Sequence, residues 1–246
     1  MKILEYGLIS ILTNAFEISN TDVRKLIWFG LLLLTISISY VLGSLSSAII
    51  VSRAMFNEDI RNHGSKNAGL TNMLRTYGKG AAIMTLAGDM LKTALAIFIT
   101  ALFFGLSGSY YSGICINGIF YLAGVAAVLG HVFPVFYGFK GGKGVLVTAT
   151  LALILSPIVF VTLLVIFILI VVFTRFVSLG SICVAAMFPA SVCLYSHFKA
   201  GRVSTLTIIS TIFLAIFIIW CHRGNIKRLL AGNEKKISIG SREKKD

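Results

Sequence analysis

Charged residues are scarce in this chain, and acidic residues are the scarcest. Only 13% of the 246 residues are charged, and nine Asp and Glu stand against 22 Lys and Arg. Proline occurs three times, and no linker rich in Pro, Ser or Gly interrupts the sequence. A soluble domain carries about a quarter charged residues. The chain is therefore not an ordinary soluble protein, and the lack of linkers predicts one compact unit.

Cysteine is also rare and shows no spacing typical of a site. The cysteines lie in or beside apolar runs without a C-x-x-C pair and are interpreted as small buried apolar residues: Cys115, Cys183, Cys193 and Cys221. The sequence also lacks a G-x-S-x-G nucleophile motif, a Walker phosphate loop and a clustered set of His, Asp and Glu. We therefore expect no serine nucleophile, no metal and no cofactor.

Apolar residues dominate what remains, at 57% of the chain with a mean hydropathy of +0.92. A membrane span needs about 20 apolar residues. The sequence predicts such spans at 26–51, 81–104, 113–129, 177–197 and 203–221. The apolar run 144–174 is interrupted only at Ser156-Pro157, and it is either one kinked helix or two short spans. Asp89 and Lys92 share one face of the second span, where they can pair.

The distribution of positive charge decides between the two interpretations of 144–174. The net charge of +13 fits residues that flank membrane spans better than a nucleic-acid surface. Two short spans place sixteen Lys and Arg on the cytoplasmic side and five outside, whereas one kinked helix moves the tail charges and Arg175 outside. The positive-inside rule thus favours an all-α integral membrane protein with about seven transmembrane helices, its N-terminus outside and its C-terminus cytoplasmic.

Three units are expected along the chain. Residues 1–25 form an N-terminal extension of unknown role, which does not resemble a cleavable signal peptide. Residues 26–232 form the membrane domain, and residues 233–246 form a basic cytoplasmic tail.

The most unusual stretch is GHVFPVFYGFKGGKG at 130–144, where Gly141, Gly142 and Gly144 surround Lys143. Glycine lets backbone N–H groups converge on an anion, and lysine adds a positive charge. A helix that starts near Gly142 would direct its positive end to the same point. We predict an anion-binding element here. The simpler alternative is a tight turn with a lysine at the level of the lipid headgroups.

Two further polar segments fall on the same predicted cytoplasmic face. The segment 59–72 combines hydroxyl and amide donors with Arg61, whose guanidinium suits bidentate contact with phosphate. Its simpler interpretation is a solvated basic loop. The segment 175–181 contains Ser178, which either donates to a ligand or caps the following helix.

The segment HRGNIKRLLAG at 222–232 completes the polar set. His222 and Asn225 are three residues apart and share a helix face, while the basic residues around them can equally face lipid headgroups. Basic and hydroxyl donors outnumber carboxylates in all four segments. We therefore expect phosphorylated substrates and mainly electrostatic catalysis.

Between about residues 36 and 236 the polar segments occur in a fixed order, namely GS-x-SSA at 43–48, DIR-x-HGSKNAG-x-TN at 59–72, GHVFPVF-x-GFKGGKG at 130–144 and HR-x-NIKRLLAG at 222–232. In this order they resemble the bacterial acyl-phosphate:glycerol-3-phosphate acyltransferases, the PlsY family. The resemblance implies transfer of a fatty acyl group from acyl phosphate to the 1-hydroxyl of sn-glycerol 3-phosphate. The products would be lysophosphatidic acid and phosphate, in phospholipid biosynthesis.

The resemblance also implies the cellular setting and the site. It implies a multi-pass protein of the bacterial plasma (inner) membrane, with its active site on the cytoplasmic side and in contact with membrane lipid. No metal, cofactor or nucleic acid takes part, and a functional link to the enzyme that makes acyl phosphate is expected. The residues carried over as catalytic are Lys143, His222, Asn225 and Arg61, and those carried over as binding substrate or phosphate are Ser44, Ser65, Asn67, Gly141, Gly142 and Ser178. No protein nucleophile is implied, and the acyl phosphate itself can accept the hydroxyl proton.

Three positions depart from the family pattern. Ser46 replaces a usual Pro and is expected to soften a break in the first span, Lys66 replaces a Gly, and Gly224 replaces an acidic or polar residue. The alternative function is a transporter or channel for a small phosphorylated anion. Such a protein would need polar features on both faces or broken helices in related halves, and the sequence shows neither. A non-catalytic scaffold would leave the clustered donors unexplained.

Overall fold

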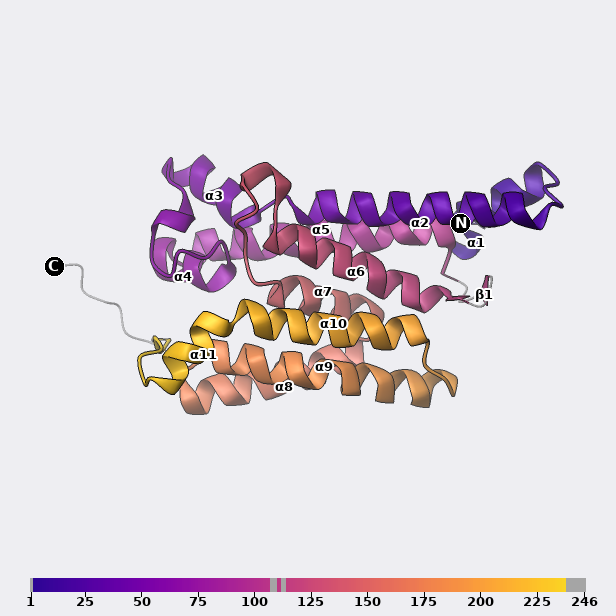
Figure 1. Ribbon diagram of the computed structural model, residues 1–246. Helices are drawn as coiled ribbons and strands as arrows, with labels where there is room; N and C mark the ends of the chain where they lie inside the picture. Colours follow the sequence, from indigo (N-terminus) through magenta and orange to yellow (C-terminus); the bar gives the residue numbers. More distant parts are fainter. Residues whose placement is uncertain (1, 107–109, 112–113, 238–246) are drawn as a thin grey trace.

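The structure of the chain, a computed structural model, describes residues 2–106, 110–111 and 114–237 (Figure 1). Gly113, the predicted start of the third span, and residues 238–246 of the predicted tail lie outside this part. The regular secondary structure of the described part is helical apart from one antiparallel pair of two-residue strands, β1 (Tyr110–Tyr111) and β2 (Ile114–Cys115). The predicted helical membrane class is confirmed.

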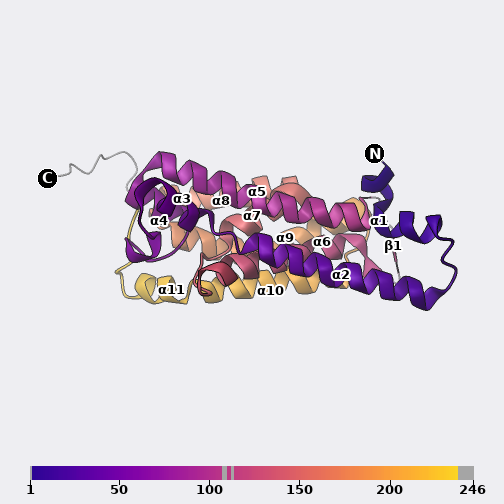
Figure 2. The ribbon, with the colours of Figure 1, turned by 90° about the horizontal axis from the view of Figure 1, so that it is seen from above.

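The long helices lie side by side, and shorter ones lie at the end of the bundle (Figures 1 and 2). The long ones are α2 (Thr21–Gly43), α5 (Lys79–Phe104), α6 (Ile116–Val132), α7 (Val145–Leu155), α8 (Pro157–Thr174), α9 (Val177–Ala200) and α10 (Thr205–Cys221). The helix α1 (Lys2–Ala15), which is kinked at Gly7, lies at one end of them. The shorter ones are α3 (Ser47–Phe56), α4 (Leu70–Tyr77) and α11 (Arg223–Leu230), with 3-10 turns at Ile60–Asn62 and Val135–Tyr137.

Five segments of the described chain are long and apolar enough to cross a membrane, and a sixth results if the bent pair of α10 and α11 counts as one span. The chain is therefore a multi-pass membrane protein. Outward-facing side chains support this, because α8 exposes Ile158, Val161, Val165 and Phe173 on the outside of the bundle. A helix that is apolar on all sides belongs in a protein core or in lipid.

The predicted first span, 26–51, lies within one apolar segment, Thr21–Phe56, which consists of two helices. The chain enters α2 five residues earlier, at Thr21, where the side chain of Asn20 accepts hydrogen bonds from the first turn. It leaves α2 at Gly43, and α3 begins at Ser47 after an extended residue, Ser46. The break is therefore complete although Ser46 replaces the usual proline. A buried ammonium stabilises it, since Lys92 Nζ donates to the carbonyl of Leu45 at 2.9 Å.

The apolar run 144–174 divides at the predicted place, Ser156-Pro157, into α7 and α8. Both the start of α7 and the end of α8 contact the C-terminal segment, through Lys143 with Asn225 and through Arg175 with Ile237. The chain therefore reverses at Ser156, as expected for a hairpin. The two arms are unequal, because the 11 residues of α7 extend only about 16 Å along the helix axis.

The polar segments gather at one end of the molecule. Figures 1 and 2 show α3, α4 and α11 at this end, while α1 and β1 lie at the opposite end. The α6–α7 connection is attached here as well, since Arg61 donates to the carbonyl of Tyr137 at 2.6 Å. We call this region, formed by residues 57–75, 133–144 and 222–237, the polar end.

Candidate active site

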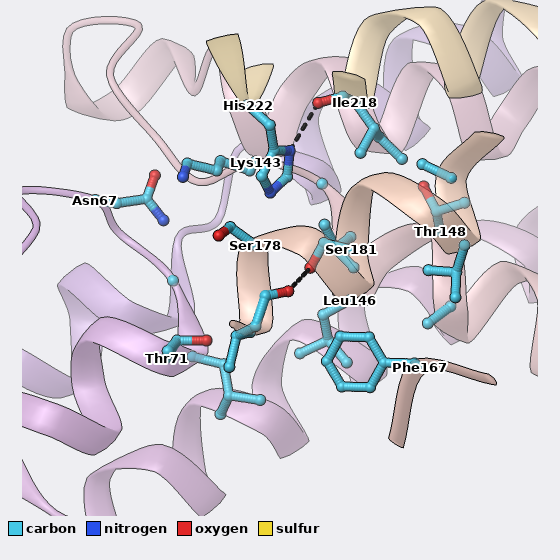
Figure 3. Close-up of a pocket in the computed structure, with 18 of the residues that line it drawn as sticks. Asn67, Thr71, Lys143, Leu146, Thr148, Phe167, Ser178, Ser181, Ile218 and His222 are labelled. Atoms are coloured by element: carbon cyan, nitrogen blue, oxygen red, sulfur yellow. Dashed lines mark hydrogen bonds between the residues drawn. The ribbon is translucent and has the colours of Figure 1, made fainter. Parts of the chain in front are cut away.

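A cavity of about 770 Å³ begins at the polar end and continues among α5, α7, α8 and α9. Its polar lining includes Ser65, Asn67, Lys143, Ser178, His222 and Asn225. Its apolar lining includes Leu153, Phe160, Leu163, Phe167, Val184 and Phe188. Figure 3 shows the side chains of Lys143, His222 and Ser178 directed into the space between the helices. One cavity thus joins a cationic, donor-rich mouth to an apolar groove.

The amides of Gly141 and Gly142, which were predicted to bind phosphate, are occupied by backbone hydrogen bonds in this structure, so that role stays a prediction. The N–H of Gly141 donates to the carbonyl of Val132 at 3.0 Å, and the N–H of Gly142 donates to the carbonyl of His131 at 3.1 Å. A side chain at Gly142 would collide with the imidazole, because its Cβ would lie 2.0 Å from His131 Nε2. These glycines let the loop pack tightly against the end of α6.

Lys143 and the start of α7 also lie at the mouth of the cavity. Gly144 has a φ of 81°, which glycine adopts without strain, and it is the residue before the helix. Lys143, Gly144, Val145 and Leu146 all line the cavity. The first N–H groups of a helix lack partners within it, and they carry the positive end of its dipole. The start of α7 therefore favours a negative charge in the mouth of the cavity.

A chain of polar contacts crosses the mouth from Lys143. The Lys143 ammonium donates to Asn225 Oδ1, and Asn225 Nδ2 donates to Glu234 Oε1 at 2.6 Å. The hydroxyl of Ser178 donates to the same carboxylate oxygen at 2.7 Å, and Arg228 Nε donates to the other oxygen at 2.7 Å. Three donor side chains thus surround one carboxylate, and Lys143 is linked to it through Asn225, which is the arrangement expected around a bound anion.

The alternative that Ser178 only caps a helix is wrong. The residue before α9 is Phe176, and Ser178 lies inside the first turn of the helix with its hydroxyl turned toward Glu234. Although partial burial alone would raise the pKa of Glu234, hydrogen bonds from Ser178, Asn225 and Arg228 hold it below its ordinary value. The mouth therefore already stabilises a negative charge.

His222 is buried at the bend between α10 and α11, with 3% of its surface exposed. Its Nδ1 lies 2.8 Å from the carbonyl oxygen of Ile218, as drawn in Figure 3. A carbonyl can only accept, so Nδ1 carries a proton and the Nε2 of the neutral ring is an acceptor. Because Nδ1 is engaged within the helix, Nε2 is the nitrogen free to meet a substrate hydroxyl.

The loop 63–69 and the start of α4 form another part of the wall of the cavity. Ser65 and Asn67, which were predicted to bind substrate, both line the cavity. The loop is held by Asn72, whose Oδ1 accepts from the N–H of Ser65 at 2.9 Å and whose Nδ2 donates to the carbonyl of Asn67 at 3.0 Å. Lys66, the residue in place of a usual glycine, also lines the cavity with a φ of 58°.

Four predicted residues do not line this cavity, namely Gly141 and Gly142, described above, and Arg61 and Ser44. Arg61 lines a second pocket, where it forms an ion pair with Asp59 at 2.8 Å and donates to the carbonyls of Tyr137 and Lys140. The hydrogen bonds from Arg61 hold the pKa of Asp59 well below its ordinary range. Ser44 is fully buried and donates to the carbonyl of Tyr40 at 2.9 Å. The structure does not bring either side chain to Lys143.

Sequence reasoning missed Glu234, which it placed in the tail, together with Arg228, Asp89 and His131, which also line the cavity. The available signal for Glu234 was one acidic residue within an otherwise basic segment, 223–236. Gly224, the third departure from the family pattern, is clear of these contacts, because the nearest atom to a Cβ there would be Arg228 Nη1 at 3.6 Å. Among the described residues, no three His, Cys, Asp or Glu side chains are placed to hold a metal ion.

The chain is similar in sequence to known enzymes. Residues 33–232 match the family described as glycerol-3-phosphate acyltransferase. The chain is 39% identical over 203 residues to a glycerol-3-phosphate acyltransferase of Paraburkholderia phymatum, covering 81% of this chain and 90% of that one. It is 40% identical over 202 residues to the enzyme of the same description from Clostridioides difficile, covering 81% and 92%.

Solved structures of similar proteins have the same fold. A crystal structure of PlsY, an integral membrane glycerol 3-phosphate acyltransferase in its glycerol 3-phosphate form, has a TM-score of 0.71 and 31% identity, covering 84% of this chain and 96% of that one. Its lysophosphatidic acid form has a TM-score of 0.69 and 30% identity, covering 84% and 95%.

Proposed function

This chain belongs to the glycerol-3-phosphate acyltransferase family, and we propose that its cavity transfers a fatty acyl group from an acyl phosphate to the 1-hydroxyl of glycerol 3-phosphate. The products are lysophosphatidic acid and inorganic phosphate. The observation that carries this proposal is the cavity itself, in which a mouth with Lys143, Ser178 and Asn225 continues into an apolar groove. An acyl phosphate has the same two parts, a dianionic head and an apolar chain.

Each residue of the mouth has its own role in the proposed reaction. Lys143 and the start of α7 bind the phosphate of the acyl donor and stabilise the charge that grows on it as the acyl–oxygen bond breaks. Ser178 and Asn225 donate hydrogen bonds to the phosphorylated substrates, which displace the Glu234 carboxylate. The neutral His222 accepts from the attacking hydroxyl and orients it. The hydroxyl oxygen bonds to the acyl carbon, and the leaving phosphate takes its proton.

The other predicted residues are proposed to support this site. Ser65 and Asn67 form part of its wall, and Gly141 and Gly142 pack the loop that presents Lys143. The catalytic role of Arg61 and the substrate-binding role of Ser44 stay predictions. In the structure Arg61 instead ties the α6–α7 connection to Asp59, and Ser44 lies at the end of α2.

We further propose seven spans, α2 and α5 to α10, with the N-terminus outside, the C-terminus cytoplasmic and the polar end at the cytoplasmic face of the bacterial inner membrane. The excess of Lys and Arg in the connections at that end supports this orientation. Glycerol 3-phosphate would enter from the cytosol, while the acyl chain lies between α7, α8 and α9. An enzyme that makes acyl phosphate must then supply the donor.

The direct test is transfer from palmitoyl phosphate to labelled glycerol 3-phosphate by the purified protein. Labelled lysophosphatidic acid should form in proportion to enzyme and time. Folded protein that gives no product, beside an active family member in the same assay, would reject the proposal. Uptake of a phosphorylated anion into proteoliposomes without product would instead favour a transporter.

The alkaline pH limit of the reaction should report on Lys143. Burial, together with the positive charge of Arg228, lowers the pKa of the Lys143 ammonium. As pH rises, the free enzyme therefore loses this charge earlier than it would from an exposed lysine. We expect kcat/KM to fall at alkaline pH with an apparent pKa below that of an ordinary lysine. In Lys143→Arg the decline should move to higher pH, because guanidinium stays charged. An identical decline in both enzymes would contradict this assignment.

Acyl-chain preference should depend on Ala185, which is buried in α9 and lines the groove. It lies seven residues beyond Ser178, or about 10 Å deeper along the helix axis. The substitution Ala185→Phe should lower kcat/KM for palmitoyl phosphate about 10-fold or more, while a shorter acyl phosphate is affected less. The control is Ala186→Phe, because Ala186 is the next residue and is exposed. Equal effects on long and short donors would contradict the assignment of the groove.

A further inference from the structure

Three titratable side chains lie together beneath the α6–α7 connection, and none has a role in the proposed function. Asp89 and Lys92 come from α5, and His131 comes from α6. At most 5% of each side chain is exposed. Lys92 Nζ lies 2.8 Å from Asp89 Oδ1 and 3.0 Å from His131 Nδ1. The pairing of Asp89 with Lys92 was predicted from their spacing, whereas the contact with His131 was not.

The cluster joins three separate pieces of backbone. Lys92 donates to the carbonyl of Leu45, in the break between α2 and α3. An ammonium can only donate, so the Nδ1 of His131 accepts from Lys92, and the other nitrogen of the neutral ring, Nε2, carries the proton. That second edge of the ring packs directly against Gly142, where a Cβ would lie 2.0 Å from Nε2.

Stability alone is a weak reason for this arrangement. Burying an ion pair removes both charges from water, and replacement of such pairs by apolar residues is often neutral or stabilising. What an apolar cluster could not do is fix the carbonyl of Leu45 and the orientation of the imidazole at the same time. The imidazole in turn limits where Gly142 can lie, and Lys143 is the next residue.

We propose that Asp89, Lys92 and His131 are positioning residues, which hold Gly142 so that the Lys143 ammonium and the start of α7 face the reacting phosphate. The inference rests on the proposed function. Asp89 fixes the Lys92 ammonium, the ammonium fixes the imidazole, and the imidazole supports the loop. A displacement of about 1 Å at a reacting group can cost about 100-fold in rate.

The experiment uses a double variant that combines Asp89→Asn and Lys92→Met, so that no unpaired buried charge remains. Its control is the single variant Thr93→Val. Thr93 is buried beside the cluster, and its hydroxyl donates only within its own helix, to the carbonyl of Asp89. The double variant should keep its thermal unfolding midpoint but lose about 100-fold in kcat/KM. Thr93→Val should stay within about 2-fold of the wild type.

Two readouts separate positioning from a loss of folded protein. Hydrogen exchange at the amides of Gly141 and Gly142 should become faster in the double variant only. In a Lys143→Ala background, adding the double variant should lower kcat/KM by less than about a further 2-fold, because the effects of residues that act through one group are not additive. A further loss as large as in the wild-type background would overturn the proposal, and so would wild-type kinetics with unchanged exchange.

If the double variant does not fold, His131→Asn tests the same idea. Asparagine keeps an acceptor for Lys92 at the Nδ1 position but removes the ring edge that supports Gly142. We expect about a 10-fold loss of kcat/KM and faster exchange at Gly142 in a folded protein. Full activity in His131→Asn would overturn the proposal. Inactivity of the wild type and of Thr93→Val would instead reject the proposed function.

Discussion

Replacing Lys143 with alanine is expected to lower kcat/KM for acyl transfer by about 100- to 1000-fold. Lys143 is the cation beside the start of α7, and it donates to Asn225 within the mouth of the cavity. The negative charge on the leaving phosphate grows as the acyl–oxygen bond breaks. The loss should therefore fall mainly on kcat. Initial rates at several concentrations of palmitoyl phosphate and glycerol 3-phosphate measure it.

The matched control is Lys140→Ala, in the same loop. Lys140 is exposed and lines the second pocket, beside Arg61, rather than the cavity. Its removal takes the same charge from the same loop at a different place. We expect activity within about 2-fold of the wild type. Equal losses in the two variants would mean that only the total positive charge of the loop matters, and near-normal turnover in Lys143→Ala would reject the site.

The sequence predicted those features that follow from the distribution of charge, from helix spacing and from short motifs. The Ser156-Pro157 break followed from the charge distribution, because only a hairpin keeps Arg175 and the tail on the side of the other basic residues. The pairing of Asp89 with Lys92 followed from their spacing on a helix. Lys143, His222 and Asn225 were expected in one site from their motifs, and all three line one cavity.

The direction of each backbone N–H group could not be predicted from the sequence. A run of glycines shows that a loop can turn sharply, but it does not show which way each N–H points. Gly141 and Gly142 donate to the end of α6, so the amides that remain for an anion are those of the first turn of α7. The residue types in this segment also did not show that Asp59 forms an ion pair with Arg61, two residues away.

Contacts between segments that lie far apart in the sequence could not be predicted either. Glu234 lies in a basic segment, so composition alone assigned it to a separate tail. In the structure residues 234–237 fold back on the mouth, where Glu234 accepts from Ser178 and Asn225, and Ile237 donates to the carbonyl of Arg175. Such a contact depends on tertiary placement of α9 and α11, which no local pattern encodes.

His222 offers the second large effect, because its two nitrogens have different partners. Nδ1 donates to the carbonyl of Ile218, and Nε2 is the acceptor proposed to orient the attacking hydroxyl. In His222→Asn the amide can replace Nδ1 but nothing replaces Nε2. In His222→Gln an amide oxygen can reach the Nε2 position. We expect about a 100-fold loss of kcat/KM for glycerol 3-phosphate in His222→Asn and a clearly smaller loss in His222→Gln.

The order of these two variants is the decisive result, because both remove the imidazole. His197→Asn provides the control, since His197 lies in the last turn of α9, away from the polar end. It should leave kcat/KM unchanged. If His222→Asn is the more active of the two site variants, the bond to Ile218 is what the reaction requires. His222 would then only maintain the bend between α10 and α11, and the acceptor hydroxyl would need another partner, for which Asn225 is the nearest candidate on the same helix face.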